Sequence, residues 1–326
     1  TQACSREALI ANPAVDIIVN LAAPLDHAAI THAALKAGKH VYCEKPLAAS
    51  VAEGAALLAC ADAMNRLLAV APATTMGPRQ QQARRLLADG TLGQVVGASA
   101  SIVYPGPDLW HHNPAALFGP AAGPLFDMAV YDIATLVDLL GPISSVAAFG
   151  RQLSGQRIIQ RGPAAGSSCP VQIPTHIVAL LQFGEGPLAT LTCSFDGFGS
   201  AAAGVELIGT QGSVRIGHSS RFSGDFSIST RLGAWEAMAA EPDDWSEDLW
   251  IIGLLDLVEA LATGHQPHCN ARRALHHLAV LEAMSSAITS SSVQPVSHAP
   301  PPARSLAAGS YAAMRRRFGL IVKDVA

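Results

Sequence analysis

The hydrophobic and polar positions of the first seventy residues alternate between strand-like and helix-like patterns. Residues 15–21 form a β-branched apolar run of strand length, which is typical of a parallel strand buried on both faces. Residues 27–37 carry apolar side chains at helical spacing, and Gly38 follows where that helix should end. Further strands are expected at residues 41–43 and 67–71, on either side of a second helix. This alternation predicts a doubly wound, Rossmann-type parallel sheet with right-handed crossovers.

The pattern changes after residue 73, where strands begin to outnumber helices. Pairs of strand-like runs flank short glycine-containing turns at residues 184–187 and 210–212, which predicts antiparallel hairpins. We therefore expect a partial dinucleotide-binding (Rossmann) domain over residues 1–73, followed over residues 74–326 by an α+β substrate-binding and oligomerisation domain with a largely antiparallel, open-faced sheet. The other elements expected in the second domain are helices at residues 79–89, 125–140, 247–263 and 271–289, a strand at 95–103, and loops at 104–122, 155–168 and 290–303.

The composition argues against several classes of function. The 326 residues carry a formal net charge of −4, which offers no electrostatic footprint for nucleic acid. No apolar run approaches the ~20 residues that a membrane span needs. The six cysteines are scattered and include no C-x-x-C pair, so we expect buried free thiols in a cytoplasmic protein and no metal site.

The carboxyl ends of the first two strands are the expected ligand-binding edge, because a parallel α/β sheet binds ligands there. Turn-forming and polar residues follow both strands, at positions 20–24 and 44–46. The G-x-G-x-x-G loop that contacts a pyrophosphate does not occur in the sequence. The glycines at residues 197–204 have the wrong spacing for it, and we expect them to form a bend or bulge.

Several segments of the chain resemble one family. AGKHVYCEKPLA, at residues 37–48, resembles the Glu-Lys-Pro segment of the glucose-fructose oxidoreductase / inositol dehydrogenase / rhizopine-catabolism (Gfo/Idh/MocA) family. The likeness covers nearly the whole chain, although it is not specific to any substrate. The further similar segments are VDIIVNLAAPLDHAAITHAALKAGKHV (15–41), ARRLLADGTLGQV (83–95), GPLFDMAVYDIATLVDLLGP (123–142), VELIGTQGSVRI (205–216) and GLLDLVEALATGHQP (253–267).

The resemblance implies an oxidoreductase that uses NAD or NADP to transfer a hydride to or from a sugar, polyol or related hydroxy compound. It gives Lys45 the catalytic role and places Glu44 near the nicotinamide ribose. In the family a glycine-rich unit of roughly 60 residues precedes the point that matches Thr1, so we expect a chain that lacks this unit. The residues expected to contact the cofactor are Asn20, Ala22, Pro24, His27, Glu44, Lys45 and Pro46.

Lys45 is the expected acid/base. A lysine can take the proton of an alcohol if desolvation or a nearby cation lowers its pKa from ~10.4 toward neutrality. Pro46 restricts Lys45 to extended backbone geometry, which helps to fix the direction of its side chain. Asp127 and Tyr131 are four residues apart, so they share a helix face and can point into one pocket. We expect Asp127 to bind substrate and Tyr131 to assist Lys45; the alternative is a polar residue near the helix start and a packing residue.

The loop before that helix is rich in aromatic and polar side chains. Indole faces stack on sugar rings, and imidazole and amide groups donate to hydroxyls, so the loop is expected to line a carbohydrate-like substrate; a purely structural loop is the alternative. The candidate substrate contacts in it are Trp110, His111, His112 and Asn113. Elsewhere, His276 and His277 are interpreted as surface or packing residues, and residues 244–248 as a solvated turn.

The sequence leaves three functions open. The leading one is the NAD(P)-dependent dehydrogenase. The second is a glycoside hydrolase on the same fold that uses the cofactor transiently, with no net reduction of it. The third is a non-catalytic, dimeric binding protein, if the chain natively lacks the phosphate loop. For the dehydrogenase, the resemblance implies a homodimer or homotetramer that assembles through the antiparallel sheet.

Overall fold

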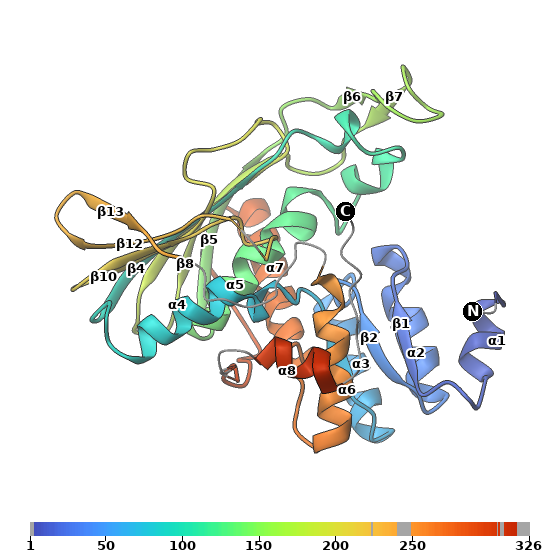
Figure 1. Ribbon diagram of the computed structural model, residues 1–326. Helices are drawn as coiled ribbons and strands as arrows, with labels where there is room; N and C mark the ends of the chain where they lie inside the picture. Colours follow the sequence, from blue (N-terminus) through green and yellow to red (C-terminus); the bar gives the residue numbers. More distant parts are fainter. Residues whose placement is uncertain (1–2, 223, 240–248, 305, 307–309, 318–326) are drawn as a thin grey trace, which may run out of the picture.

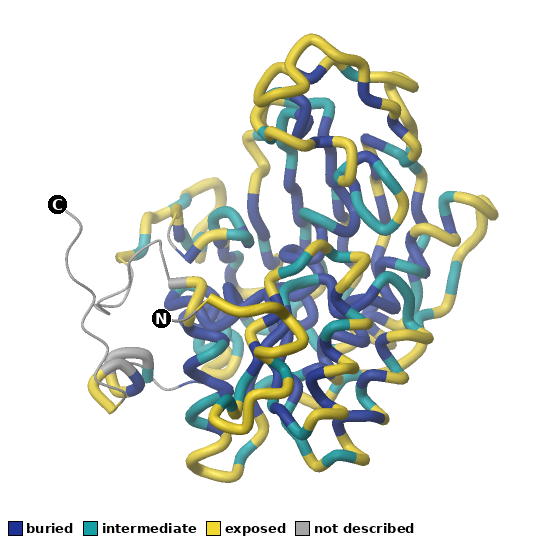
Figure 2. The backbone as a smooth tube through the Cα atoms, turned by 90° about the vertical axis from the view of Figure 1, so that its right-hand side faces the viewer, coloured by how far each residue is buried: buried dark blue, intermediate teal, exposed yellow. Residues whose placement is uncertain are grey.

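The computed structural model describes residues 3–222, 224–239, 249–304, 306 and 310–317. A small parallel sheet and a nine-stranded sheet dominate the fold (Figure 1). Helices α5 (Val130–Leu140) and α7 (Ala271–Ser290) pack on the large sheet, and α7 also contacts α3 and β3 of the smaller part. The buried stretches of backbone are concentrated in this central region, whereas loops at one end of the large sheet are exposed (Figure 2).

The small sheet has three parallel strands in the order β1-β2-β3. Its strands and the helices that connect them are β1 (Ile17–Asn20), α2 (His27–Lys36), β2 (His40–Cys43), α3 (Val51–Ala63) and β3 (Leu68–Val70). The parallel order and the helical connections confirm the Rossmann-type fold that the sequence predicts.

The side chains of β2 alternate between two apolar clusters, one on each face of the small sheet. Val41 and Cys43 lie in the main core with residues of α2 and α3. Tyr42 points the other way and packs with Leu257 of α6 (Ile252–Thr263). Helices therefore cover both faces of the sheet, and the cover of the second face comes from near the other end of the sequence.

The large sheet has the order β13-β12-β11-β10-β4-β9-β8-β5-β14, and only β4 and β9 pair in parallel. Buried and exposed residues alternate along β8, so one face packs on the helices and the other stays open. This confirms the largely antiparallel, open-faced sheet. Its strands are β4 (Val95–Val103), β5 (Ser145–Arg151), β8 (His176–Gln182), β9 (Leu188–Ser194), β10 (Gly204–Gly209), β11 (Ser213–Ile216), β12 (Phe226–Arg231), β13 (Ala234–Ala237) and β14 (Gln294–Pro295).

The remaining elements are short helices at the margins of these layers. No helix among the described residues is both long and apolar enough to cross a lipid bilayer. These elements are α1 (Arg6–Ala11), α4 (Pro78–Ala88) and α8 (Ser310–Arg317), with 3-10 turns at Pro24–Asp26, Thr74–Met76, Pro107–Leu109, Pro114–Phe118 and Leu249–Ile251.

The apolar segment expected as one helix over residues 125–140 forms two elements instead. A π-helical turn, Pro124–Ala129, precedes α5. Gly123 begins it with φ +75°, a conformation that L side chains rarely adopt, and a β-carbon there would meet the Ile173 side chain at 2.4 Å. The wider turn changes the spacing along the helix between Asp127 and Tyr131, which the sequence period cannot reveal.

Two segments expected as loops contain short strands, so these expectations are wrong in part. Residues 155–168 overlap a small hairpin of β6 (Gln156–Ile158) and β7 (Ser168–Pro170), and β14 within residues 290–303 pairs with β5. Runs of two or three residues are too short to produce a recognisable alternation. The predicted helix at 247–263 begins at Ile252, and residues 244–248 lie outside the described residues.

A buried ionic cluster fixes the C-terminal half of α5. The carboxylate of Asp138 lies 2.6 Å from Arg84 of α4 and 3.1 Å from Arg273 of α7, and 3.2 Å from His268. Burial alone would raise the pKa of Asp138, but His268, Arg84 and Arg273 lower it by more, so the pKa falls to about 2. Asp138 is therefore ionised at neutral pH and joins α5 to the two neighbouring helices.

Candidate functional site

The turns after β1 and β2 lie side by side at the carboxyl edge of the parallel sheet. The Glu44 amide donates to the Asn20 carbonyl oxygen at 2.9 Å. The buried side-chain amide of Asn20 donates to the His27 carbonyl and to the Thr31 hydroxyl, both at 3.1 Å. The Asn20 side-chain oxygen accepts from the Ala22 amide at 3.3 Å. Asn20 therefore stabilises its own turn, and its contact with a cofactor stays a prediction.

His27 joins the two turns. Its ring is buried, with Nδ1 2.7 Å from the Pro46 carbonyl oxygen and Nε2 3.0 Å from the Ala22 carbonyl oxygen. A ring nitrogen that carries a hydrogen donates to the carbonyl oxygen that it faces. The ring thus links the Pro46–Leu47 peptide to the start of α2. Pro24, also expected to contact the cofactor, begins the 3-10 turn that connects β1 to α2.

Lys45 reaches from the small sheet to the helix that packs on the large one. Its ammonium donates to the Asp127 carboxylate at 2.7 Å and to the Asp127 carbonyl oxygen at 2.6 Å. The same nitrogen lies 5.1 Å from the centre of the Tyr131 ring. The Lys45 side chain is 11% exposed and that of Asp127 22%. The structure therefore brings together the three residues that the sequence singled out for chemistry.

The charge state of Lys45 differs from the expectation. Burial lowers the pKa of Lys45, but Asp127 above all, with Tyr131 and Glu44, raises it more, so its pKa lies above the ordinary value. The expected fall toward neutrality is therefore wrong for the protein by itself, and Lys45 is an ammonium ion at neutral pH. Burial, opposed by the charge of Lys45, raises the pKa of Tyr131 to about 12. Tyr131 is a neutral phenol and cannot act as the base.

The sequence reasoning missed two aromatic side chains: Trp250, which lies beside Tyr131, and Phe222, which lies beside Trp250. The Trp250 ring is edge-on to the Tyr131 ring at 6.4 Å and to the Phe222 ring at 5.7 Å. Trp250 is 46% exposed, whereas Phe222 is buried. A tryptophan within the segment predicted as a helix, residues 247–263, was the only signal in the sequence. Its position at the site depends on α6 packing against the small sheet, which local patterns do not report.

The loop expected to line the substrate lies next to the turn between β6 and β7, which contacts His112. Trp110 Nε1 donates to the Pro105 carbonyl at 3.2 Å, and the His111 and His112 rings stack at 4.7 Å. The Asn113 amide donates to His111 Nδ1 at 3.0 Å. These contacts give the loop a defined conformation, and its contact with substrate stays a prediction.

The paired histidines of α7 are buried, so their interpretation as packing residues is confirmed and the surface alternative is wrong. His276 Nε2 accepts from the Ile143 amide at 3.0 Å, and its Nδ1 lies 2.7 Å from the His298 carbonyl. Burial lowers the pKa of His276 and of His277, so both rings are neutral at neutral pH.

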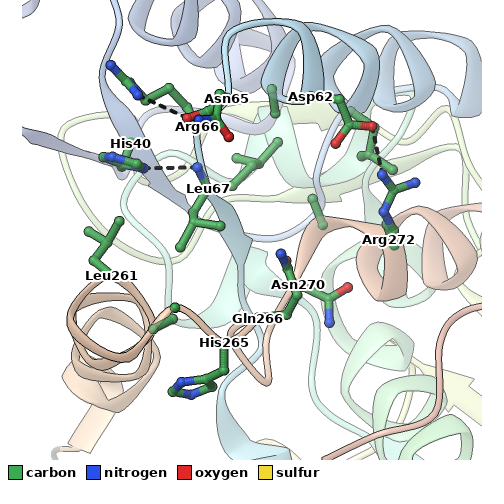
Figure 3. Close-up of a pocket in the computed structure, with 16 residues that line it drawn as sticks. His40, Asp62, Asn65, Arg66, Leu67, Leu261, His265, Gln266, Asn270 and Arg272 are labelled. Carbon is green, nitrogen blue, oxygen red and sulfur yellow. Dashed lines mark hydrogen bonds and ion pairs between the residues drawn. The ribbon is translucent and has the colours of Figure 1, made fainter.

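A polar cleft of about 560 Å³ lies at the opposite, amino edge of the parallel sheet (Figure 3). His40 Nδ1 accepts from the Leu67 amide at 2.9 Å, and Arg66 donates to the carbonyl of Gly38 at 2.6 Å. Asp62 and Arg272 form an ion pair at 2.7 Å across the upper rim. The polar side chains named here bond to other groups of the protein, and the cleft lies at the opposite edge of the sheet from Lys45. The cleft is therefore separate from the site around Lys45.

Comparison with known protein families places both parts of the chain in one family. Residues 2–71 match the oxidoreductase family with NAD-binding Rossmann fold (GFO_IDH_MocA), and residues 80–215 match the GFO/IDH/MocA C-terminal domain. The chain belongs to the GFO/IDH/MocA family. Family membership confirms the resemblance that begins at the Glu-Lys-Pro segment. The domain boundary at residues 73 and 74 stays a prediction.

Two curated relatives and one solved structure illustrate the likeness. The chain is 24% identical over 262 residues to levoglucosan dehydrogenase from Pseudarthrobacter phenanthrenivorans, a match that covers 74% of this chain and 66% of the relative. It is 28% identical over 212 residues to trans-1,2-dihydrobenzene-1,2-diol dehydrogenase from Homo sapiens, covering 65% and 58%. The chain thus spans less than two thirds of the length of these relatives. The structure of levoglucosan dehydrogenase in complex with NADH supports the fold, with a TM-score of 0.75, 18% identity and coverage of 90% and 83%.

Replacing Asp127 with asparagine is expected to lower the pKa of Lys45. The change removes the charge that contributes most to raising this pKa, while the burial that lowers it remains. Competitive acetylation of the lysine amines over a series of pH values, read by mass spectrometry, measures the pKa of each amine. Lys36, exposed on α2, is the internal control and should not change. An unaltered Lys45 pKa in this variant would show that the ion pair does not set its charge.

Proposed function

We propose that the protein is an NAD(P)-dependent dehydrogenase that acts on a sugar, a polyol or a related hydroxy compound. The observation that carries this proposal is the contact of Lys45 with Asp127 and Tyr131 at the carboxyl edge of the parallel sheet. An ammonium ion, a carboxylate and a neutral phenol around one point can bind and protonate the oxygen of a small hydroxy compound. The NAD-binding family and the names of the two relatives support the same class of reaction.

Lys45 is the acid/base residue in this proposal. When a carbonyl is reduced, negative charge develops on its oxygen, and the Lys45 ammonium gives a proton to it. In the oxidative direction Lys45 must first lose a proton, and the charge of Asp127 opposes this loss. A substrate hydroxyl that donates to Asp127 weakens the ion pair, so the Lys45 ammonium loses its proton more easily and the neutral amine can accept the substrate's proton. Tyr131 remains neutral and donates a second hydrogen bond to the reacting oxygen.

The turns after β1 and β2 fit the nicotinamide end of NAD or NADP. The Glu44 carboxylate can accept hydrogen bonds from ribose hydroxyls, and the exposed Leu21 and Leu25 provide apolar surface at the same edge. The bound cofactor supplies or accepts the hydride. The glycine-rich pyrophosphate loop does not occur in these 326 residues, so the fit concerns the nicotinamide end. The residues that would hold this end are Asn20, Ala22, Pro24, His27, Glu44, Lys45 and Pro46.

Aromatic surface near the site supports a carbohydrate-like substrate. Trp250 is half exposed beside Tyr131 and can present its indole to the apolar face of a sugar ring. Asp127 retains exposed surface with which it can accept from a substrate hydroxyl. The neighbouring loop adds further contacts in this proposal, from Trp110, His111, His112 and Asn113.

We also propose that the protein forms a homodimer or homotetramer through the open face of the large sheet. Phe149 of β5 and Val178 of β8 are cross-strand neighbours on this face, and Leu180 follows two residues along. These three side chains are 74%, 44% and 60% exposed. An apolar patch of this kind on a sheet is typical of an interface.

Replacing Leu180 with aspartate is therefore expected to weaken self-association by about a hundredfold, because an unpaired carboxylate buried in an interface costs several kcal/mol. Sedimentation equilibrium of the chain measures the change. The matched control is Leu232→Asp in the turn between β12 and β13, where an apolar side chain is exposed away from that face. Equal association constants for the two variants would contradict the proposed interface.

Replacing Lys45 with alanine is expected to lower kcat by roughly 10²–10⁴-fold, the usual contribution of a positioned acid/base. The reaction is followed as absorbance of the reduced nicotinamide with a panel of sugars and polyols, and calorimetry checks that cofactor binding is retained. Lys36→Ala is the control for a lost surface charge. An unchanged kcat would overturn the role of Lys45. Product formed without net cofactor reduction would favour the hydrolase, and no binding of NAD or NADP would favour the non-catalytic protein.

A further inference from the structure

A second carboxylate lies next to the site but faces away from Lys45. Asp132 follows Tyr131 on α5 and is fully buried. One of its oxygens accepts from the Ser219 hydroxyl at 2.5 Å. The other oxygen has no hydrogen-bond partner among the described residues, and neither has the Thr135 hydroxyl one turn further along α5. A buried carboxylate with a single hydroxyl donor is an expensive arrangement if it carries a charge.

Ser219 belongs to the segment that connects β11 to β12, and this segment returns to the candidate site. Its Gly217 amide donates to the Asp225 carbonyl at 2.7 Å, and its His218 ring packs edge-on against Tyr104 at 5.1 Å. The ring of its Phe222 packs edge-on against the Trp250 ring, with 5.7 Å between the ring centres, and the Trp250 and Tyr131 ring centres are 6.4 Å apart. A continuous set of contacts therefore leads from Asp132 through residues 217–222 back to the neighbour of Asp132 in sequence.

Among the residues that the structure describes, no cation forms an ion pair with the Asp132 carboxylate. Burial raises its pKa to about 7, against the smaller opposing effect of the Ser219 hydrogen bond. The titratable group most affected by its charge is the Cys193 thiol of β9, whose pKa burial and Asp132 both raise. Other titratable groups of the surrounding elements make no resolved contribution to the Asp132 pKa: Arg79 and Arg84 of α4, Tyr104 after β4, His218 and Arg221 of the connecting segment, Tyr131, Asp138 and Lys45 around α5, and Arg273, His276 and His277 of α7.

We propose that Asp132 is a positioning residue whose protonated form fixes residues 217–222, and through Phe222 sets Trp250 against Tyr131. Ionisation of Asp132 places a poorly compensated charge in the core, and the cost of burying it exceeds the gain from the Ser219 hydrogen bond. Ionisation therefore favours opening of this segment, which hydrates the carboxylate. The aromatic wall of the site is then ordered below neutral pH and loosened above it. This role rests on the proposed function, because the position of Trp250 matters to catalysis only if the site around Tyr131 is catalytic.

Hydrogen exchange of the wild-type chain tests this without any substrate. Each pH unit above the pKa increases the ratio of ionised to neutral carboxyl tenfold. After correction for the intrinsic exchange rate, the protection of residues 217–222 should therefore fall by about tenfold between about pH 6 and about pH 8. The peptide that contains Trp250 should follow it, whereas peptides from the middle of α7 should not change. Protection that is the same at both pH values would overturn the proposal, and this result needs no variant to fold.

Three variants separate titration from packing. Asp132→Asn keeps an oxygen that accepts from Ser219 but cannot ionise, so protection at the higher pH should equal that of the wild type at the lower pH. Ser219→Ala removes the hydrogen bond that favours the ionised carboxylate, so the loss of protection should move to higher pH. Ser220→Ala, whose hydroxyl bonds only within its own segment to His218 at 2.9 Å, is the matched control and should keep the wild-type difference between the two pH values. If the asparagine variant retains the wild-type pH dependence, Asp132 is not the titrating group.

The outcome is also independent of the dehydrogenase proposal. If the protection of residues 217–222 changes with pH as predicted but Lys45→Ala leaves kcat unchanged, the role of Asp132 stands and the role of Lys45 is wrong. If the protection does not change with pH but Lys45→Ala loses most of its kcat, the role of Lys45 stands and only the role of Asp132 is wrong.

Discussion

The ion pair between Lys45 and Asp127 is the constraint on which the rest of the site depends, because it connects two parts of the chain that fold around different sheets. Lys45 stands at the end of β2 in the parallel sheet, and Asp127 lies in the π-helical turn that leads into α5 on the large sheet. A pair this poorly exposed stabilises the fold only if hydrogen bonds satisfy both partners. On the lysine side, the ammonium donates to the carboxylate and to the carbonyl of Asp127.

Much of the fold could be predicted from local patterns. The strand at residues 95–103 and the stop of α2 before Gly38 both depend on neighbouring residues, and the structure reproduces them. The π-helical turn, the cover of the small sheet by α6 and the place of Trp250 depend instead on contacts between residues distant in sequence. A hydrophobic period carries no information about such contacts, so these features were missed.

The proximity of the candidate site residues Lys45, Asp127 and Tyr131 could be predicted, but their charges could not. Lys45, Asp127 and Tyr131 stand in motifs that resemble the family, and the structure brings all three into contact. Desolvation by itself suggested a lysine with a lowered pKa. The nearby carboxylate reverses that direction, so the protein alone holds an acid that is ready to donate. Substrate binding to Asp127 is the step that would turn this acid into a base.

The most direct test of this account is chemical rescue of the Lys45→Ala variant by small primary amines. If Lys45 acts as the acid/base, amines that enter the vacated space should restore part of the lost turnover, and the rate should depend on the basicity of the amine once its size is allowed for. Lys36→Ala should not respond to the amines. Turnover that amines leave unchanged, or that rises equally with amines of every basicity, would contradict proton transfer by Lys45.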